Sequence, residues 1–228
     1  MKYLKIFEKF EFDDIDFTCK ELGINQYTIN PDGSVDVDGD VYLAEKRLKK
    51  IPIKFGRVSG SFYCQDNKLT TLEGSPSKVG GEFFCFRNEL TTLEGSPKEV
   101  GRNFDCHANE IITLEGAPRE VGRGFYCSFN KLTTLEGAPI EVGGHFWCNA
   151  NKLISLEGLT KNLDINGFEC ERNPICELYK LFPNHKSYMD SLDYNYLRGT
   201  NIVKRRLEEA LDEVDIKMPK SIHGYRWI

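Results

Sequence analysis

The sequence predicts a solenoid built of repeats with leucines at fixed positions, in which short strands from successive repeats stack into a parallel β-sheet. Three observations predict it. One sequence motif recurs with a 21-residue period between Val41 and Leu178. In each copy, one part alternates apolar and other residues as a strand does, and another part contains a Leu-Glu-Gly-x-Pro turn. Stacked copies bury a continuous apolar core that no single copy could bury alone.

The period holds residue by residue, and the shared frame is Phe-x-Cys-x-x-Asn-x-Leu-x-x-Leu-Glu-Gly-x-Pro. Its cysteine and asparagine columns contain Cys64, Cys85, Cys106, Cys127 and Cys148, and Asn67, Asn88, Asn109, Asn130 and Asn151. Divergent copies precede and follow these, which makes seven units over residues 41–178. A strict period of roughly 20 to 29 residues with this pattern is typical of leucine-rich repeats.

Each residue type has a physical reason within such a repeat. Phe and Cys stand at alternate positions, so both point inward from a short strand and the residues between them point outward. The asparagine amides are expected inside, bonded to backbone groups of adjacent turns that would otherwise be unpaired. Gly and Pro then reverse the chain, so we expect one parallel sheet on a concave face and an extended or turn-like convex side.

Residues 1–40 are expected to form an N-terminal cap. The segment from Asp13 to Leu22 predicts a short helix with apolar contacts from Ile15, Phe17 and Cys19. Residues 27–38 read as a hairpin around a Pro-Asp-Gly-Ser turn. We expect this hairpin to cover the exposed edge of the first repeat strand, at Val41 to Leu43.

Residues 179–228 are expected to form a helical C-terminal cap and a tail. The clearest helix spans Asn201 to Asp215, where Val203, Leu207 and Leu211 fall on one apolar face. A second helix is expected between Tyr188 and Leu197. The apolar tail is expected to pack on the cap, and an exposed partner-binding tail is the alternative.

Composition sets broad limits on the function. The chain has 228 residues, 40% of them hydrophobic and 29% charged, as in an ordinary soluble protein. Its start lacks an apolar secretory core, and it contains no run long enough to span a membrane, so we expect a cytoplasmic protein. A net charge of -5 argues against nucleic acid as the partner.

The cysteines are expected to be small buried hydrophobes. A disulfide framework does not suit a chain without an export signal, and ligands strung along one line cannot close a zinc tetrahedron. The acidic run from Asp32 to Asp40 resembles a calcium loop only in one register and lacks the preceding helix, so turn chemistry is preferred over a weak cation site. We therefore expect no metal, no cofactor and, with no activated nucleophile or paired-carboxylate site, no enzyme.

The outward strand residues are the candidate binding site. Aromatic side chains recur there turn over turn, and contiguous exposed aromatic surface usually marks an interface. The alternative is that the rings only stabilise the sheet. The candidate partner-binding residues are Tyr63, Phe84, Phe86, Arg87, His107, Tyr126, Phe129 and Trp147.

Glutamates form two further columns, which are expected to be solvated because like charges at strand spacing repel. Solubility is the expected role, and a basic partner is the alternative. The columns contain Glu73, Glu94, Glu115, Glu136 and Glu157, and Glu99, Glu120 and Glu141.

The string GSVDVDGDVYL, the link from Lys50 to Val58 and the repeated FxCxxNxLTTLEGxPxEV resemble the short leucine-rich repeat proteins of tailed, T4-like bacteriophages. The resemblance covers about residues 25–182. It implies a recognition scaffold that engages a host protein, in host takeover or in countering defence. Some bacterial leucine-rich repeat effectors carry a ubiquitin-ligase domain, but residues 179–228 are too few for one and contain no cysteine.

The leading hypothesis is therefore a non-enzymatic protein-binding module that uses an aromatic concave face. The alternative is a nucleotide or single-stranded nucleic acid binder, in which the rings stack bases and Arg87, His107 and Arg172 contact phosphate. Self-association through the same face also stays open.

Overall fold

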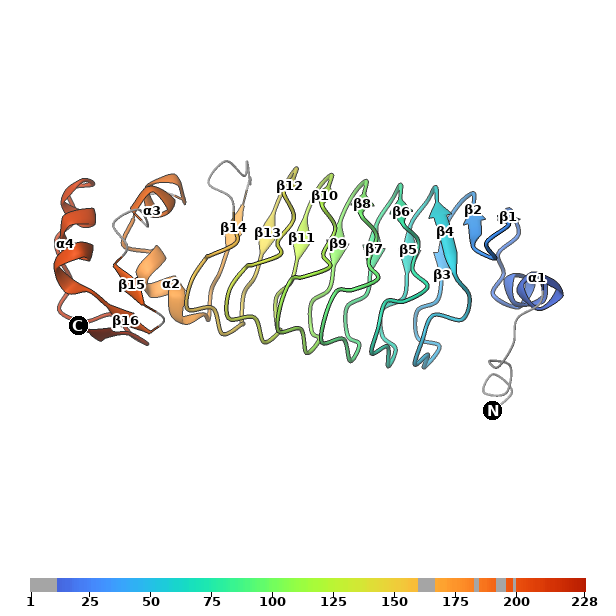
Figure 1. Ribbon diagram of the computed structural model, residues 1–228, viewed down its shortest axis with the longest axis horizontal. Helices are drawn as coiled ribbons and strands as arrows, with labels where there is room; N and C mark the ends of the chain where they lie inside the picture. The colour runs from blue at the N-terminus through green and yellow to red at the C-terminus, as the bar shows by residue number, and fades with distance from the viewer. Residues whose placement is uncertain (1–11, 160–166, 183–184, 192–195, 199) are drawn as a thin grey trace.

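The computed structural model describes residues 12–159, 167–182, 185–191, 196–198 and 200–228. It is a parallel β-solenoid, in which successive coils stack along the long axis of the molecule (Figure 1). The coils follow a nearly straight axis in this view, so the expected concave face is better described as the outer face of a sheet. No helix among the described residues is long and apolar enough to cross a membrane.

Each repeat contributes one strand to a seven-stranded sheet, called sheet B here. Neighbouring strands pair in parallel, and each residue lies beside its equivalent one repeat later, as Phe83 does beside Phe104. This is the sheet that the Phe-x-Cys alternation predicts. Its strands are β3 (Val41–Tyr42), β5 (Phe62–Tyr63), β7 (Phe83–Phe84), β9 (Phe104–Asp105), β11 (Phe125–Tyr126), β13 (Phe146–Trp147) and β14 (Phe168–Glu169).

A second seven-stranded sheet, sheet A, was not predicted. The convex side was expected to be merely extended or turn-like, but the Glu-Val pairs of successive coils form ladders there, with Glu120 beside Glu99 and Glu141. In these strands the valine is buried and the glutamate faces outward. The strands are β1 (Tyr27–Ile29), β2 (Val35–Val37), β4 (Phe55–Val58), β6 (Lys78–Val79), β8 (Glu99–Val100), β10 (Glu120–Val121) and β12 (Glu141–Val142).

The core between the sheets consists of ladders of identical side chains. The rings of Phe83 and Phe104 stack with centroids 5.4 Å apart and planes within 4°. The repeated cysteines and both leucine columns are fully buried beside them. Asn109 shows how the predicted asparagine ladder works. Its side-chain amide donates hydrogen bonds of 3.1 Å to the carbonyls of both Cys85 and Cys106. Backbone groups that would be buried unpaired are thereby satisfied.

The N-terminal segment contains the expected helix and hairpin, but the hairpin lies elsewhere. Helix α1 spans Phe12–Glu21, and β1 pairs antiparallel with β2. Strand β2 pairs with β4, so the hairpin extends sheet A, and β3 remains the end strand of sheet B. Of the predicted apolar contacts of α1, Ile15 and Cys19 are buried, whereas Phe17 is 52% exposed.

The C-terminal segment is mixed rather than helical. Helices α2 (Pro174–Tyr179), α3 (His185–Ser191) and α4 (Lys204–Asp212) accompany a small sheet of β15 (Leu197–Arg198), β16 (Asn201–Ile202) and β17 (Arg226–Trp227). The predicted helix therefore begins three residues late, because Asn201 and Ile202 pair with the tail. Its apolar face is confirmed by the burial of Leu207 and Leu211. The tail packs on the last coils, where the Tyr225 hydroxyl donates to the Ile154 carbonyl over 2.9 Å.

Candidate functional site

The outer face of sheet B presents the aromatic column that the sequence predicts. Tyr63, Phe84, Tyr126 and Trp147 occupy equivalent strand positions, and each is half-buried. Asp105 takes the same position in β9, between Phe84 and Tyr126. The carboxylate divides the rings into two groups, which we call the N-terminal cluster and the C-terminal cluster.

The N-terminal cluster is a continuous chain of rings along the sheet. The Tyr63 ring lies 5.5 Å from the Phe84 ring, edge to face, and Phe84 lies 5.8 Å from Phe86. Phe86 then stacks on the His107 imidazole with centroids 4.6 Å apart and planes within 18°. At the other end Tyr42, which is not among the candidate residues given above, stacks on Tyr63 at 5.2 Å and is 59% exposed. Its position in the same column was the signal that could have included it.

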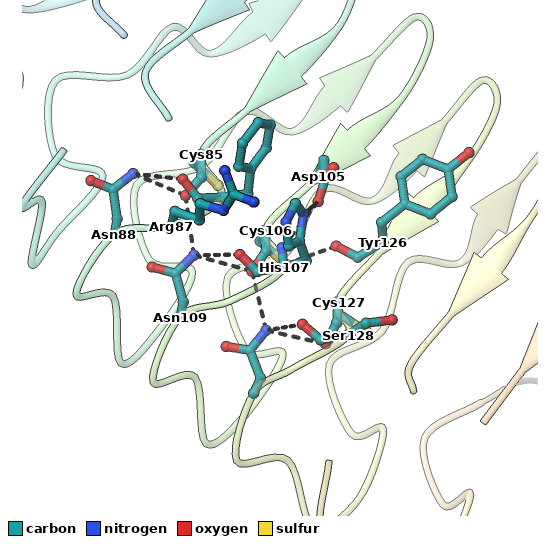
Figure 2. Close-up of polar contacts among 12 residues, drawn as sticks. Cys85, Arg87, Asn88, Asp105, Cys106, His107, Asn109, Tyr126, Cys127 and Ser128 are labelled. Carbon is teal, nitrogen blue, oxygen red and sulfur yellow. Dashed lines mark hydrogen bonds and ion pairs between the residues drawn. The ribbon is translucent and has the colours of Figure 1, made fainter. Parts of the chain in front are cut away.

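Asp105 holds the imidazole of this cluster in place. Its Oδ1 lies 2.8 Å from Nδ1 of His107 and also accepts from the His107 backbone N–H over 3.0 Å, as Figure 2 shows. One carboxylate oxygen thus fixes both the backbone and the ring. The imidazole is presented flat against Phe86 and keeps little rotational freedom to lose when a partner binds.

Arg87 lies at the edge of the N-terminal cluster, in the bend after the strand. Its backbone has a positive φ of 50° and its side chain is exposed. The guanidinium carbon lies 5.9 Å from the centre of the Phe86 ring, and Nη1 lies 3.6 Å from a carboxylate oxygen of Asp66. The arginine therefore extends the aromatic surface sideways while its charge is partly balanced.

The C-terminal cluster combines Tyr126 and Trp147, whose ring centres are 4.8 Å apart. Tyr126 leans over Gly124, where a Cβ would come within 2.3 Å of the tyrosine oxygen. Burial, with smaller effects from Asp105 and Glu82, raises the pKa of Tyr126. His145 also belongs here, with its ring 5.6 Å from Trp147, although its place outside the Phe-Cys frame gave no signal.

Phe129 does not join either cluster. It occupies the bend position equivalent to Arg87, with a φ of 57°, and is 54% exposed. No aromatic pair includes it among the described residues. The remaining candidate residues thus form two preorganised clusters, and Phe129 is an isolated apolar side chain on the rim.

The cysteine column offers no reactive group to this face. The thiols of Cys85, Cys106 and Cys127 are fully buried, and burial raises their pKa well above the usual value. All eight cysteines are free. Thiols in this state are inert structural groups rather than nucleophiles.

The described part of the chain was also searched for clusters of metal-ligating side chains. There, no group of three His, Cys, Asp or Glu residues could hold a metal ion. The aspartates of the run from Asp32 to Asp40 already accept hydrogen bonds from nearby protein groups. Asp36, for example, accepts a hydrogen bond of 2.8 Å from the Arg57 backbone N–H. The His107–Asp105 pair makes no hydrogen bond to a hydroxyl or thiol within the same described ranges.

Comparison of the chain with protein-family models, with curated proteins and with solved structures found no match. The candidate site therefore rests on its own geometry.

Proposed function

We propose that this protein is a non-enzymatic recognition scaffold that binds a partner protein through the outer face of sheet B. The observation that carries the proposal is the pair of aromatic clusters on one rigid, open sheet. Aromatic side chains dominate protein interfaces because they bury a large area while losing few rotatable bonds.

The rings of both clusters are held before any partner arrives. Phe86 contacts the tilted ring of Phe84 and stacks on His107, and His107 is fixed by Asp105. A preorganised surface loses little side-chain entropy on binding, so more of its contact energy appears as affinity. The half-buried state of these rings leaves apolar area that a partner can still cover.

Nucleotide binding is the second candidate, and one observation favours it. The flat Phe86–His107 stack beside Arg87 could receive a base and a phosphate. The charges nearby favour protein instead, because Asp66 pairs with Arg87 and Asp105 pairs with His107. Both side chains that would meet a phosphate already face a carboxylate.

The resemblance to bacteriophage repeat proteins completes the proposal. A phage-encoded scaffold would act in the host cytoplasm on a bacterial protein, in host takeover or in countering defence. The solenoid architecture supports this use, since stacked repeats provide an extended rigid surface for recognition.

Capture from a bacterial extract tests the proposal. Immobilised wild-type protein is compared with the Tyr126→Asp/Trp147→Asp double variant, and the bound proteins and small molecules are identified by mass spectrometry. We expect a protein retained by the wild type and lost from the variant. A retained nucleotide would replace the proposal with the second candidate, and equal retention by both proteins would contradict the role of the C-terminal cluster.

A further inference from the structure

The outer face of sheet A carries a groove that is separate from the aromatic clusters. It has a volume of about 560 Å³ and runs across β6, β8, β10 and β12. A second groove of about 610 Å³ continues it toward β1 and shares Lys78 and Gly80. Together they form one furrow along the solenoid axis, on a surface that the proposed function does not use.

Glycines form the floor of this furrow because the coils approach closely there. A Cβ on Gly101 would lie 2.2 Å from the carbonyl oxygen of Gly80, and one on Gly122 would lie 2.2 Å from that of Gly101. No side chain fits between such neighbours without moving backbone. Close packing therefore explains the glycines and the depth of the furrow, but it does not explain the charges beside them.

Glutamates line the C-terminal half of the groove in an arrangement that is unfavourable for folding. Glu120 lies directly beside Glu99 and Glu141 in the parallel ladder. Like charges opposite each other destabilise a sheet. Glu99 is balanced by an ion pair with Lys78, whereas Glu120 and Glu141 have no ion pair with any described residue.

An apolar side chain stands at the same end. In the column beside the glutamates, Lys98 and Arg119 are followed by Ile140, which lines the groove and is 51% exposed. Arg119 is the last cation of this column, so Glu141, unlike Glu120, has an apolar residue beside it. Lysine and arginine lay their aliphatic stems on apolar surface while their charged ends reach an anion, so Ile140 and Glu141 together complement such a side chain.

We infer that this groove binds an extended, basic polypeptide segment of a partner protein, with lysine or arginine side chains over Glu120 and Glu141 and an aliphatic stem against Ile140. Strands about 4.8 Å apart place the carboxylates of Glu99, Glu120 and Glu141 over roughly 10 Å. Glu120 and Glu141 lie on adjacent strands within this span. Side chains on one face of an extended peptide recur about every 6.6 Å, so the flexible stems of two basic residues at alternate positions can converge on this pair.

Fluorescence anisotropy with a labelled (Lys-Thr)5 peptide tests the inference at low salt. The wild type is expected to bind it, and the same peptide with glutamate in place of lysine is expected not to bind. In the Glu120→Gln/Glu141→Gln variant the Kd should rise at least tenfold. The matched control is Glu115→Gln/Glu136→Gln, which removes two exposed glutamates of the other column and should change the Kd less than twofold.

Several outcomes would overturn the inference. Absence of binding by the wild type would do so, as would equal losses in the two glutamine variants, since these would indicate only general negative charge. Spermidine binding as tightly as the peptide would show that the groove needs no polypeptide. The Tyr126→Asp/Trp147→Asp variant should bind the peptide normally, so failure of the groove and failure of the aromatic face are distinguishable.

Discussion

The side-chain amide of Asn109 donates to the carbonyl oxygen of Cys85, one coil earlier in the solenoid, over 3.1 Å. The same amide donates to Cys106 in its own coil, while its Oδ1 accepts from the Leu90 backbone N–H over 3.1 Å. Each asparagine of the ladder thereby joins two consecutive coils. The ladder makes the solenoid continuous, and it runs from Asn67 to Asn173.

Replacing Asn109 by alanine should therefore destabilise the whole stack. The variant leaves the buried Leu90 N–H without its partner, while the Cys85 carbonyl keeps the bond from Asn88. This loss should lower the free energy of unfolding by about 3 kcal/mol. Urea unfolding followed by circular dichroism measures the change. Asn25→Ala is the control, because Asn25 is exposed and makes one bond of 3.2 Å to Gly23, so its loss should be small. Equal effects in the two variants would contradict the role of the ladder.

A methyl group on Gly101 should also be costly. Its Cβ would meet the Gly80 carbonyl oxygen at 2.2 Å, so adjacent coils must separate. We expect Gly101→Ala to lower the free energy of unfolding by about 1 to 3 kcal/mol, as overpacking does. Gly144→Ala is the matched control, since its nearest atom lies at 3.2 Å and it should lose less than half as much. A Gly101→Ala protein as stable as the wild type would show that adjacent coils can separate at little cost.

Ala108 occupies the left-handed bend before the asparagine, with a φ of 53°. This conformation is strained for residues with a Cβ and worst for β-branched ones. We expect Ala108→Val to be less stable than the wild type and Ala108→Gly to be at least as stable. The two variants should differ by about 2 kcal/mol in thermal or chemical unfolding. The opposite order would show that the bend is not constrained.

The buried thiols should be unreactive toward thiol reagents in the native protein. Because burial raises the pKa of Cys106 and its neighbours in the column, a thiol reagent at pH 8 should leave them unmodified until denaturant is added. Rapid modification of any of these cysteines in the native state would contradict their burial.

The same pKa shifts set the pH dependence of stability. In the unfolded chain these thiols ionise near the ordinary cysteine pKa of 9.0, but in the folded chain they stay protonated. The folded state then binds more protons than the unfolded state. The contribution of these thiols to the free energy of unfolding is therefore fully present below pH 9 and is lost as the pH rises above 9. Each thiol contributes about 1.4 kcal/mol per pH unit there. Cys106→Ala should therefore reduce the slope of stability against pH above 9, and an unchanged slope would contradict this assignment.

The 21-residue period was enough to predict the coil, the inward Phe and Cys columns and the asparagine ladder. Sheet A was missed because its strands are two residues long in most coils, and a Glu-Val pair alone carries no readable alternation. The C-terminal sheet was missed because Ile202 pairs with Trp227, far along the chain. Local propensity cannot indicate such pairing.

The candidate site was also predictable only in part from the sequence. Column positions predicted which rings share a face, since Tyr126 and Trp147 follow each other in register. The separation into two clusters depends on how Asp105 draws His107 toward Phe86, and hence on side-chain rotamers that a repeat pattern does not specify.

The affinity of the captured partner for three proteins tests the central claim most directly: the wild type, the Tyr126→Asp/Trp147→Asp variant and an Ile140→Asp variant on sheet A. Calorimetry provides the Kd, and circular dichroism confirms that each protein is folded. We expect the aromatic variant to bind at least tenfold more weakly and Ile140→Asp to bind like the wild type. Unchanged affinity in a folded aromatic variant would contradict recognition through the outer face of sheet B.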